Sequence, residues 1–481
     1  MPITPRFHLT QTETHVILDI QVPHVRVNAQ SVEVLIENNS VHFSSPPYLL
    51  VLGFPFPFRE SNNEGTAKYD PIREGGMVTM ELEKEHPEIW PDLDLMATLM
   101  RPSMKSGKGG PGRVIVLSDE RSEDIDDEVE TVPTSTADLM NIGRPHYGFA
   151  NMFVSFFVDL VRDGMATEMI QLTNPDETVA EQRRELRIAF EQEKFDPDRY
   201  LEDLDVSDDY IYQCAMGMQT FWNDLAELTR NLANLSTTAE TSSYFTKEEA
   251  MQLAAIAYPI LPDDCAKQQL LLGLIDILYA FVYDHLLTQG DPTVESSWNI
   301  CTLSSTLSWL DTFDDLLQVV QSSIRRSLIF PYTRNYEFSI YCWRQTMAIL
   351  TQGRRCVIRS LLIVRSILEH SEFHYLGNKL YVDVYLAWLQ RGVEDEDLRQ
   401  VVKSLEAILK LDQVEKSSLG LNLVELENEF VGYEEGHDND DDDDNDDNDD
   451  EELTDEDSDH KESSVTDTVC KPLIEEISLI T

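Results

Sequence analysis

Two histidines in the segment HSEFH have the most suggestive spacing for chemistry in this chain. His370 and His374 lie four residues apart, which would place both imidazoles on one face of a helix, as in a two-histidine zinc site. The zinc-protease pattern has Glu directly after the first His, whereas this chain has Ser371, and no third ligand is indicated nearby. We therefore expect no metal here.

Other segments resemble chemical motifs only superficially. In SGKGGPG the lysine precedes the glycines instead of following them, and no strand leads into it, so a linker is favoured over a phosphate loop. The acidic pairs Asp263-Asp264 and Asp314-Asp315 are expected by chance among 89 acidic residues. No nucleophile elbow, paired C-x-x-C or dinucleotide fingerprint is present. The sequence favours an interaction protein without cofactor, not an enzyme.

Negative charge is the dominant chemical feature. The net charge is −52, and the run HDNDDDDDNDDNDDEE belongs to a segment, residues 434–459, with 18 acidic residues and no Lys or Arg. Such a run predicts a solvated, disordered tail. Residues 147–433 carry 44 acidic and 23 basic residues, a net charge of −21, so the acidity is not confined to the tail.

This charge limits the kinds of partner. Binding nucleic acid requires Lys and Arg to neutralise phosphates, so a basic protein is a better partner than RNA or DNA. We expect a monomer that does not bind membranes. The apolar stretch QQLLLGLIDILYAFVYDHLL is interrupted by Asp276 and predicts a buried core helix. Six scattered cysteines and the lack of a signal-peptide pattern favour an intracellular protein.

Residues 1–102 predict a small antiparallel β-sandwich. Val16, Leu18, Ile20 and Val22 alternate with polar residues, the period of a half-buried strand. The segment SVEVLIENNSVHFSS predicts a hairpin that turns at Asn38-Asn39, because Asn tolerates the left-handed conformation of tight turns. YLLVLGFP and MVTMELEKE supply further strands.

The remainder divides into a linker, a helical domain and a tail. Residues 103–146 predict a flexible linker, residues 147–433 an all-α domain, and residues 434–481 a disordered acidic tail. Thr246 and Glu249 have capping-box spacing at the start of a helix. Trp298, Trp309, Trp343 and Trp388 recur in apolar helical stretches, which predicts that most are core residues.

Several segments resemble a known family, the assembly factors of H/ACA ribonucleoproteins that act as chaperones of the pseudouridine synthase dyskerin. In the helical domain the resemblance rests on YGFANMFVSFF, KFDPDRYLEDL, LIDILYAFVYDHLLTQGDPTVESSWNICTLSSTLSWL and FPYTRNYEF. The N-terminal part is similar to that family's CS domain through LDIQVPHVRV, PYLLVLGFP, KYDPIREGGMVTMELEKE and WPDLDLMATLMRP.

The resemblance implies a function. It implies an assembly chaperone of H/ACA ribonucleoproteins in the nucleus, acting in ribosomal RNA pseudouridylation and ribosome biogenesis. In that family the helical domain binds dyskerin before RNA does and covers its basic RNA-binding surface. The resemblance thus gives a reason for a helical domain with a net charge of −21, because its carboxylates would lie where RNA phosphates otherwise bind.

Candidate partner-binding residues lie in three matched segments. The densest acidic cluster surrounds KFDPDRYLEDL, VESSWNI contributes a second group, and the segment after Pro331 is expected to brace the same region. A solvated acidic loop, a core position for Trp298 and a helix-capping role for Glu295 are the alternative interpretations. The candidates are Asp196, Asp198, Glu202, Asp203, Asp205, Asp208, Asp209, Glu295, Trp298, Asn299, Tyr332 and Arg334.

Two other functions stay open. The sandwich could serve as a co-chaperone adaptor that links a client to the ninety-kilodalton heat-shock chaperone. Alternatively, the acidic tail could make the protein a histone chaperone. Deleting residues 1–146 or residues 434–459, respectively, would separate these functions from binding of a dyskerin-type synthase.

Overall fold

The computed structural model places the N-terminal strands and most of the helical region. It describes residues 3–23, 33–59, 67–100, 144–166, 170–206, 208–224, 244–256, 267–410 and 414–437. Met1–Glu429 form one compact unit and Phe430–Thr481 a second. The predicted tail and linker lie outside the described residues except for 434–437 and 144–146, so their predicted disorder stays a prediction.

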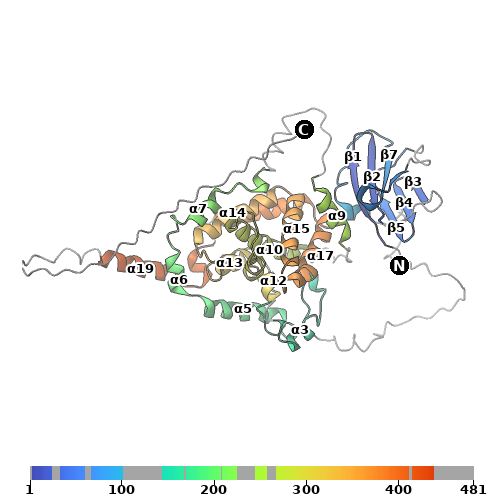
Figure 1. The fold of residues 1–481 in the computed structure, drawn as a ribbon. Helices are drawn as coiled ribbons and strands as arrows, with labels where there is room; N and C mark the ends of the chain where they lie inside the picture. The colour runs from blue at the N-terminus through green and yellow to red at the C-terminus, as the bar shows by residue number, and fades with distance from the viewer. Residues whose placement is uncertain are drawn as a thin grey trace, which may run out of the picture. The chain divides into compact units, whose positions relative to one another are not determined.

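The N-terminal part is a sandwich of two antiparallel sheets (Figure 1). Strands β1 (Arg6–Gln11), β2 (His15–Gln21), β7 (Met77–Glu83) and β6 (Ala67–Asp70) pair in that order. Strands β3 (Glu33–Glu37), β4 (Ser40–Ser45) and β5 (Tyr48–Gly53) form the second sheet. The predicted sandwich is therefore confirmed.

Alternation along the strands determines which face is buried. Val16, Leu18 and Ile20 of β2 are buried, while the residues between them are partly exposed. The predicted turn joins β3 to β4, where Asn38 has a φ of +47° and the strands pair from Glu37–Ser40 onward. A side chain that tolerates positive φ is needed at that turn.

Most of the described residues between 144 and 437 are helical, as predicted for residues 147–433. The short helix α1 (Met96–Leu99) ends the sandwich segment. The helices that follow are α3 (Val158–Arg162), α5 (Ala180–Lys194), α6 (Pro197–Glu202), α7 (Tyr210–Gly217), α9 (Lys247–Ala255), α10 (Lys267–Leu287), α11 (Ser296–Leu303), α12 (Ser305–Trp309), α13 (Leu316–Ser327), α14 (Tyr336–Thr351), α15 (Arg354–Glu369), α16 (Tyr375–Gly377), α17 (Asp383–Arg391), α18 (Asp395–Lys410) and α19 (Leu423–His437).

Helix α10 is the centre of this region (Figure 1). Among the described residues it is the one helix long and apolar enough to cross a membrane, but every residue from Leu270 to Leu286 is buried by protein. It contacts α7, α11, α12, α13, α14 and α15. A helix that is apolar on all sides requires such a surrounding shell, so the predicted core helix is confirmed.

Local signals define the ends of several helices. The predicted capping box is present: Thr246 accepts a hydrogen bond from the Glu249 amide, and the Glu249 side chain accepts one from the Thr246 amide. The long apolar stretch SIYCWRQTMAILTQGRRCVIRSLLIVRSIL is divided into α14 and α15 at Gly353, whose φ is +88°. A side chain is strained in that conformation, so glycine ends one helix and allows the next to begin in a new direction.

The sandwich and the helical region contact each other within the first unit. Helix α9 packs against β1, and α1 packs against α9 and α17. Asp92 and Asp94, which follow the last strand, form ion pairs with Arg354 and Arg355 at the start of α15.

Candidate functional site

The candidate site lies at the C-terminal end of α10, where three of the family-like segments meet. The Tyr283 hydroxyl donates a hydrogen bond to the carbonyl of Thr333. One residue further along α10, Asp284 Oδ1 accepts a hydrogen bond from Asn299 Nδ2 at 3.1 Å. The last turn of α10 thus holds the segment after Pro331 on one side and α11 on the other.

The acidic segment, residues 196–209, contains the short helix α6 and leads into α7. Asp196 caps α6 by accepting a hydrogen bond from the Arg199 amide at 3.4 Å, with Pro197 at the first helical position. Asp209 caps α7 by accepting from the Ile211 amide at 2.7 Å. Both caps satisfy amides that a helix start leaves unpaired. Two of the predicted partner-binding carboxylates therefore also have a structural role.

Capping and packing turn the other carboxylates of this segment outward. Tyr200 is buried and its hydroxyl donates to Glu427 of α19, which fixes the inner face of α6. The side chains of Asp198, Glu202, Asp205 and Asp208 are exposed. Seven acidic residues and one arginine lie within residues 196–209, so this face carries concentrated negative charge.

Asp203 and Arg334 brace this segment, as the sequence predicted for Arg334. Asp203 Oδ2 accepts a hydrogen bond from the Arg334 amide at 2.8 Å and lies 3.3 Å from its Nη1. Asn335 Nδ2 adds bonds to the carbonyls of Asp203 and Leu204 at 3.1 and 3.3 Å. Asp203 therefore joins α6 to the loop that carries Tyr332, whose side chain is 75% exposed.

Helix α11 corrects two sequence-based interpretations. Trp298 was expected in the core but is 45% exposed, because α11 buries its opposite face through Ile300, Cys301 and Leu303. Glu295 does occupy the N-cap position, yet its side chain accepts no capping hydrogen bond. Trp309, Trp343 and Trp388 are buried, as predicted.

Two exposed residues were missed by the sequence reasoning. Val294 is 92% exposed directly before Glu295, and Tyr210 is exposed at the first position of α7. Each residue is adjacent in sequence to a predicted candidate, Val294 to Glu295 and Tyr210 to Asp209, and this adjacency could have identified them. We call the following set the acidic-aromatic surface: Asp196, Asp198, Glu202, Asp205, Asp208, Tyr210, Val294, Glu295, Trp298 and Tyr332.

Two titratable side chains at the C-terminal end of α10, Asp284 and His285, are buried. Burial raises the pKa of the Asp284 carboxyl above its ordinary value, and hydrogen bonds from Asn299 and Ser296 oppose this only in part. Burial also lowers the pKa of His285 to about 4, since its ring packs against Trp222 and Phe281. Burial thus disfavours the charged form of both side chains at this end of α10.

The two histidines of HSEFH lie close to the start of α11, where His370 lines a pocket together with Val294 and Ser297. His370 Nδ1 lies 2.6 Å from the Ser366 carbonyl, and His374 Nδ1 lies 3.2 Å from Ser297 Oγ. Across the described ranges, no three His, Cys, Asp or Glu side chains converge on a position that could hold a metal ion.

A buried cluster of charged side chains lies near the C-terminal end of α5, the helix that precedes the acidic segment. Glu191 of α5 is fully buried and bonds Arg187 at 2.8 Å, Arg325 at 2.7 Å and Arg326 at 2.8 Å. Arg325 also donates to the Leu419 carbonyl at 2.6 Å, just before α19. Burial alone would raise the pKa of Glu191, but the guanidinium groups of Arg187 and Arg326 outweigh it and hold that pKa below its ordinary value.

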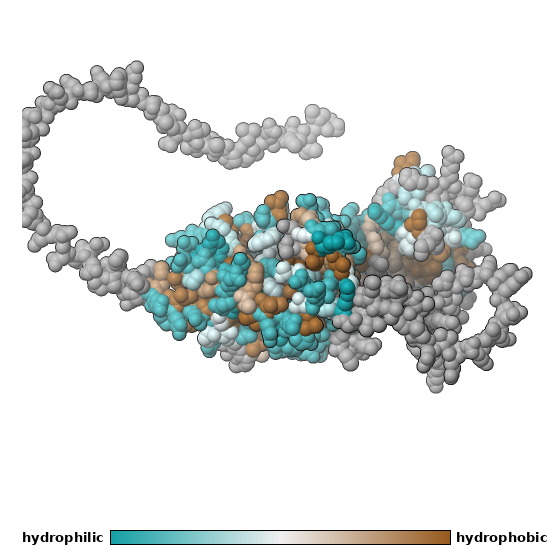
Figure 2. Space-filling model, turned by 90° about the horizontal axis from the view of Figure 1, so that it is seen from below, coloured by the Kyte–Doolittle hydropathy of each residue, from teal (hydrophilic) through white to brown (hydrophobic). Residues whose placement is uncertain are grey.

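This cluster makes α5 bury its charged face. Arg183, Arg187 and Glu191 recur every fourth residue on the inner side, while Leu186 is 48% exposed on the outer side. Figure 2 shows apolar and hydrophilic residues interspersed over the helical region seen from below. The four-residue spacing of these charged residues could have indicated a charged face of α5 from the sequence. The same spacing is expected when that face is exposed to solvent, so burial could not be predicted from it.

Comparisons with known proteins match both parts of the chain. Residues 4–100 match the family described as "SHQ1-like, CS domain", and residues 234–423 match "SHQ1 protein, Shq1 domain". The protein SHQ1 homolog of Mus musculus is 32% identical over 439 residues, covering 88% of this chain and 74% of the mouse protein. Protein shq1 of Schizosaccharomyces pombe is 31% identical over 426 residues, covering 81% of this chain and 88% of the yeast protein.

Proposed function

Because the chain belongs to the SHQ1 family, we propose that it is an assembly factor of H/ACA ribonucleoproteins that binds a dyskerin-type pseudouridine synthase. The family is consistent with an assembly factor and not with an enzyme. The partner, the occupied surface and a nuclear site of action are part of the proposal.

The acidic-aromatic surface is the observation that carries the proposal. Exposed carboxylates lie on α6 and on the connection from α6 to α7, Asp203 joins this segment to the loop that exposes Tyr332, and Trp298 is exposed on α11. A basic RNA-binding surface would be attracted by the carboxylates, which speeds association and sets orientation. The aromatic side chains would supply the contacts that slow dissociation, since Trp and Tyr dominate binding hot spots. Carboxylates then occupy positions that phosphates would take, and RNA and this protein compete.

The experiment measures binding of the full chain to the purified synthase, with guide RNA as competitor, across a salt series. A triple variant, Asp198→Asn, Glu202→Gln and Asp208→Asn, removes three exposed charges without touching either helix cap. We expect association to slow roughly tenfold and its salt dependence to weaken. The matched control, Glu33→Gln, Glu37→Gln and Glu81→Gln, removes the same charge from exposed positions of the sandwich.

The outcomes separate the hypotheses. Mutual exclusion of RNA and protein, lost in the triple variant but not in the control, supports the proposal. A ternary complex with RNA would overturn the competition mechanism. No binding in any variant would leave the heat-shock adaptor function, which requires only the sandwich. Point variants in the full chain are preferable to deleting residues 1–146, because that deletion uncovers Arg354 and Arg355.

A further inference from the structure

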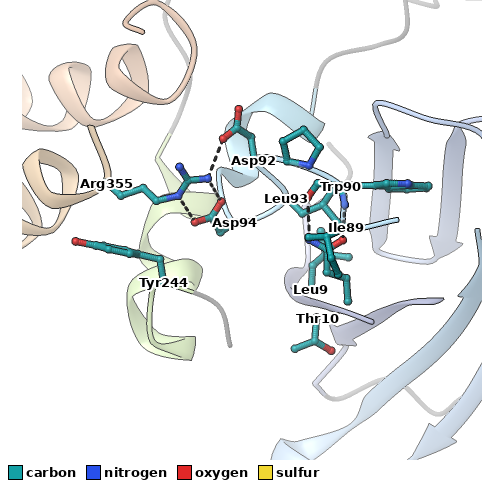
Figure 3. A pocket seen from close by; sticks show the side chains of 11 residues that line it. Leu9, Thr10, Ile89, Trp90, Asp92, Leu93, Asp94, Tyr244 and Arg355 are labelled. Carbon is teal, nitrogen blue, oxygen red and sulfur yellow. Dashed lines mark hydrogen bonds and ion pairs between the residues drawn. The ribbon is translucent and has the colours of Figure 1, made fainter. Parts of the chain in front are cut away.

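Four charged side chains, Asp92, Asp94, Arg354 and Arg355, join the sandwich to the helical region, and Figure 3 shows the first two with Arg355. Arg355 Nε donates to Asp94 Oδ2 at 2.6 Å, and Arg355 Nη2 donates to Asp94 Oδ1 and Asp92 Oδ1, both at 2.8 Å. Arg354 Nη2 donates to Asp92 Oδ2 at 2.8 Å. The Arg355–Asp94 pair is bidentate, the arrangement in which an ion pair specifies orientation as well as attraction.

The two aspartates are held in place from the sandwich side. They follow Trp90, whose amide donates to Gln11 Oε1 at 2.9 Å and whose carbonyl accepts from Gln11 Nε2 at 2.8 Å. Gln11 belongs to β1, and Trp90 is buried. The segment that carries Asp92 and Asp94 is therefore fixed to the sandwich.

The two arginines are held equally firmly from the helical side. Gly353, with its φ of +88°, directs the chain into α15, and Asp395 Oδ1 accepts a hydrogen bond from the Arg354 amide at 2.8 Å. A Cβ on Gly353 would lie 2.9 Å from Asp395 Oδ1, so this approach depends on glycine. Since both halves are positioned in advance, little side-chain entropy opposes their pairing.

Apolar packing beside the ion pairs is incomplete. A cavity of about 290 Å³ adjoins them, lined by Leu9, Ile89, Trp90 and Tyr244 with Arg355 (Figure 3). Close packing is what makes an apolar interface hard to separate. With a gap of this size at the junction, the charged residues hold the orientation of the sandwich together with the contacts of α9 with β1 and of α1 with α9 and α17.

The pairs are also accessible to salt. Asp92 is 40% exposed and Arg355 28% exposed at the side chain, so mobile ions can screen them. Burial opposes ionisation of Asp92, but the guanidinium groups of Arg354 and Arg355 outweigh it and lower its pKa. Asp92 therefore stays charged at neutral pH, and ionic strength is the variable that weakens the contact.

We propose that Asp92, Asp94, Arg354 and Arg355 form an electrostatic latch that holds the sandwich on the helical region in one orientation and opens as ionic strength rises. Opening uncovers two arginines in a region whose net charge is −21. The orientation of the sandwich then depends on the ions and charged ligands around the protein.

Hydrogen exchange of the full chain tests the latch, because it reports α1 and α17 separately from the rest. In wild type we expect exchange in these helices to rise as NaCl increases from about 0.1 M to about 1 M, over which the Debye length falls from about 10 Å to about 3 Å. In Asp92→Asn/Asp94→Asn it should be about tenfold faster at low salt and nearly independent of salt. Strands β2 and β7 should exchange as in wild type.

Two further variants complete the test. Glu406→Gln removes an exposed Lys410–Glu406 pair of α18 and should change neither helix. The charge swap of all four residues, Asp92→Arg/Asp94→Arg/Arg354→Asp/Arg355→Asp, should restore slow exchange and its salt dependence, which a sandwich that merely misfolded would not show. Equal exchange of α1 and α17 in wild type and Asp92→Asn/Asp94→Asn at all salt concentrations would overturn the latch and assign the junction to apolar contacts.

Discussion

Asp203 and Arg334, which are 131 residues apart in the chain, meet through two hydrogen bonds to a single carboxylate oxygen. One bond comes from the backbone amide of Arg334, so the contact positions the loop itself and not only a side chain. This relationship joins the C-terminal end of α6, within the acidic segment, to the loop that exposes Tyr332.

Replacing Asp203 should therefore weaken both folding and binding. Asp203→Ala leaves the Arg334 amide and guanidinium without their partner, and we expect a loss of roughly 1.5–3 kcal/mol in the free energy of unfolding. Chemical denaturation measures this. Asp198→Ala, on the exposed side of the same helix, should change stability by less than about 0.5 kcal/mol. Arg334→Ala combined with Asp203→Ala should cost less than the two single changes added; strict additivity would show that the contact is energetically unimportant.

Glu191 is expected to be the most sensitive carboxylate. Glu191→Gln leaves Arg187, Arg325 and Arg326 buried with one negative charge fewer, and breaking a buried ion pair costs roughly 3–5 kcal/mol. Thermal unfolding of the variant and of Glu193→Gln, an exposed position on the same helix, provides the comparison. Equal melting temperatures for the two variants would refute the structural role of the cluster.

The same residue predicts a pH dependence. Because the pKa of Glu191 is lowered in the folded state, its ionic contacts stabilise the fold above roughly pH 4.3, the ordinary glutamate pKa. That stabilisation is lost as pH falls through the folded-state pKa. Wild type should therefore lose more stability on acidification than Glu191→Gln, measured as the difference between their denaturation midpoints at each pH.

Protonation of His285 should reduce stability at a higher pH than protonation of Glu191 does. Its pKa is lowered to about 4 by burial, whereas an unfolded chain binds that proton near pH 6.5. The free energy of unfolding should thus fall by roughly 3 kcal/mol between about pH 6.5 and about pH 4. His285→Gln should remove this component, and His86→Gln, at an exposed position, should retain it. Parallel pH profiles for wild type and His285→Gln would contradict the assignment.

Substitutions of Trp298 and Trp343 are expected to have opposite effects on partner binding and on stability. Trp298→Ala should weaken partner binding by about 2 kcal/mol or more, roughly 30-fold in Kd, with a smaller change in stability because the residue is 45% exposed. Trp343, fully buried and stacked on Tyr279 at 4.9 Å, should show the reverse: Trp343→Ala should cost about 3–5 kcal/mol of stability. Calorimetry of binding and of unfolding on both variants distinguishes them. Unchanged binding by Trp298→Ala would remove that residue from the acidic-aromatic surface.

The sequence alone determined the elements whose signal is local. Alternation in β2, the Asn38 turn, the Thr246–Glu249 capping box and the uninterrupted apolar run of α10 each depend on neighbours within a few residues, and the structure contains all four. Family-like segments likewise contain the acidic and aromatic residues that we propose for partner binding, which stays a prediction.

Tertiary structure decided the features that depend on distant residues. Trp298 is exposed because α11 turns its other face to the core, and α5 buries its charges because α13 supplies Arg325 and Arg326. The pairing of Asp92 and Asp94 with Arg354 and Arg355 spans about 260 positions of chain. A local pattern specifies that one face of an element differs from the other, but which face is buried depends on what packs against it.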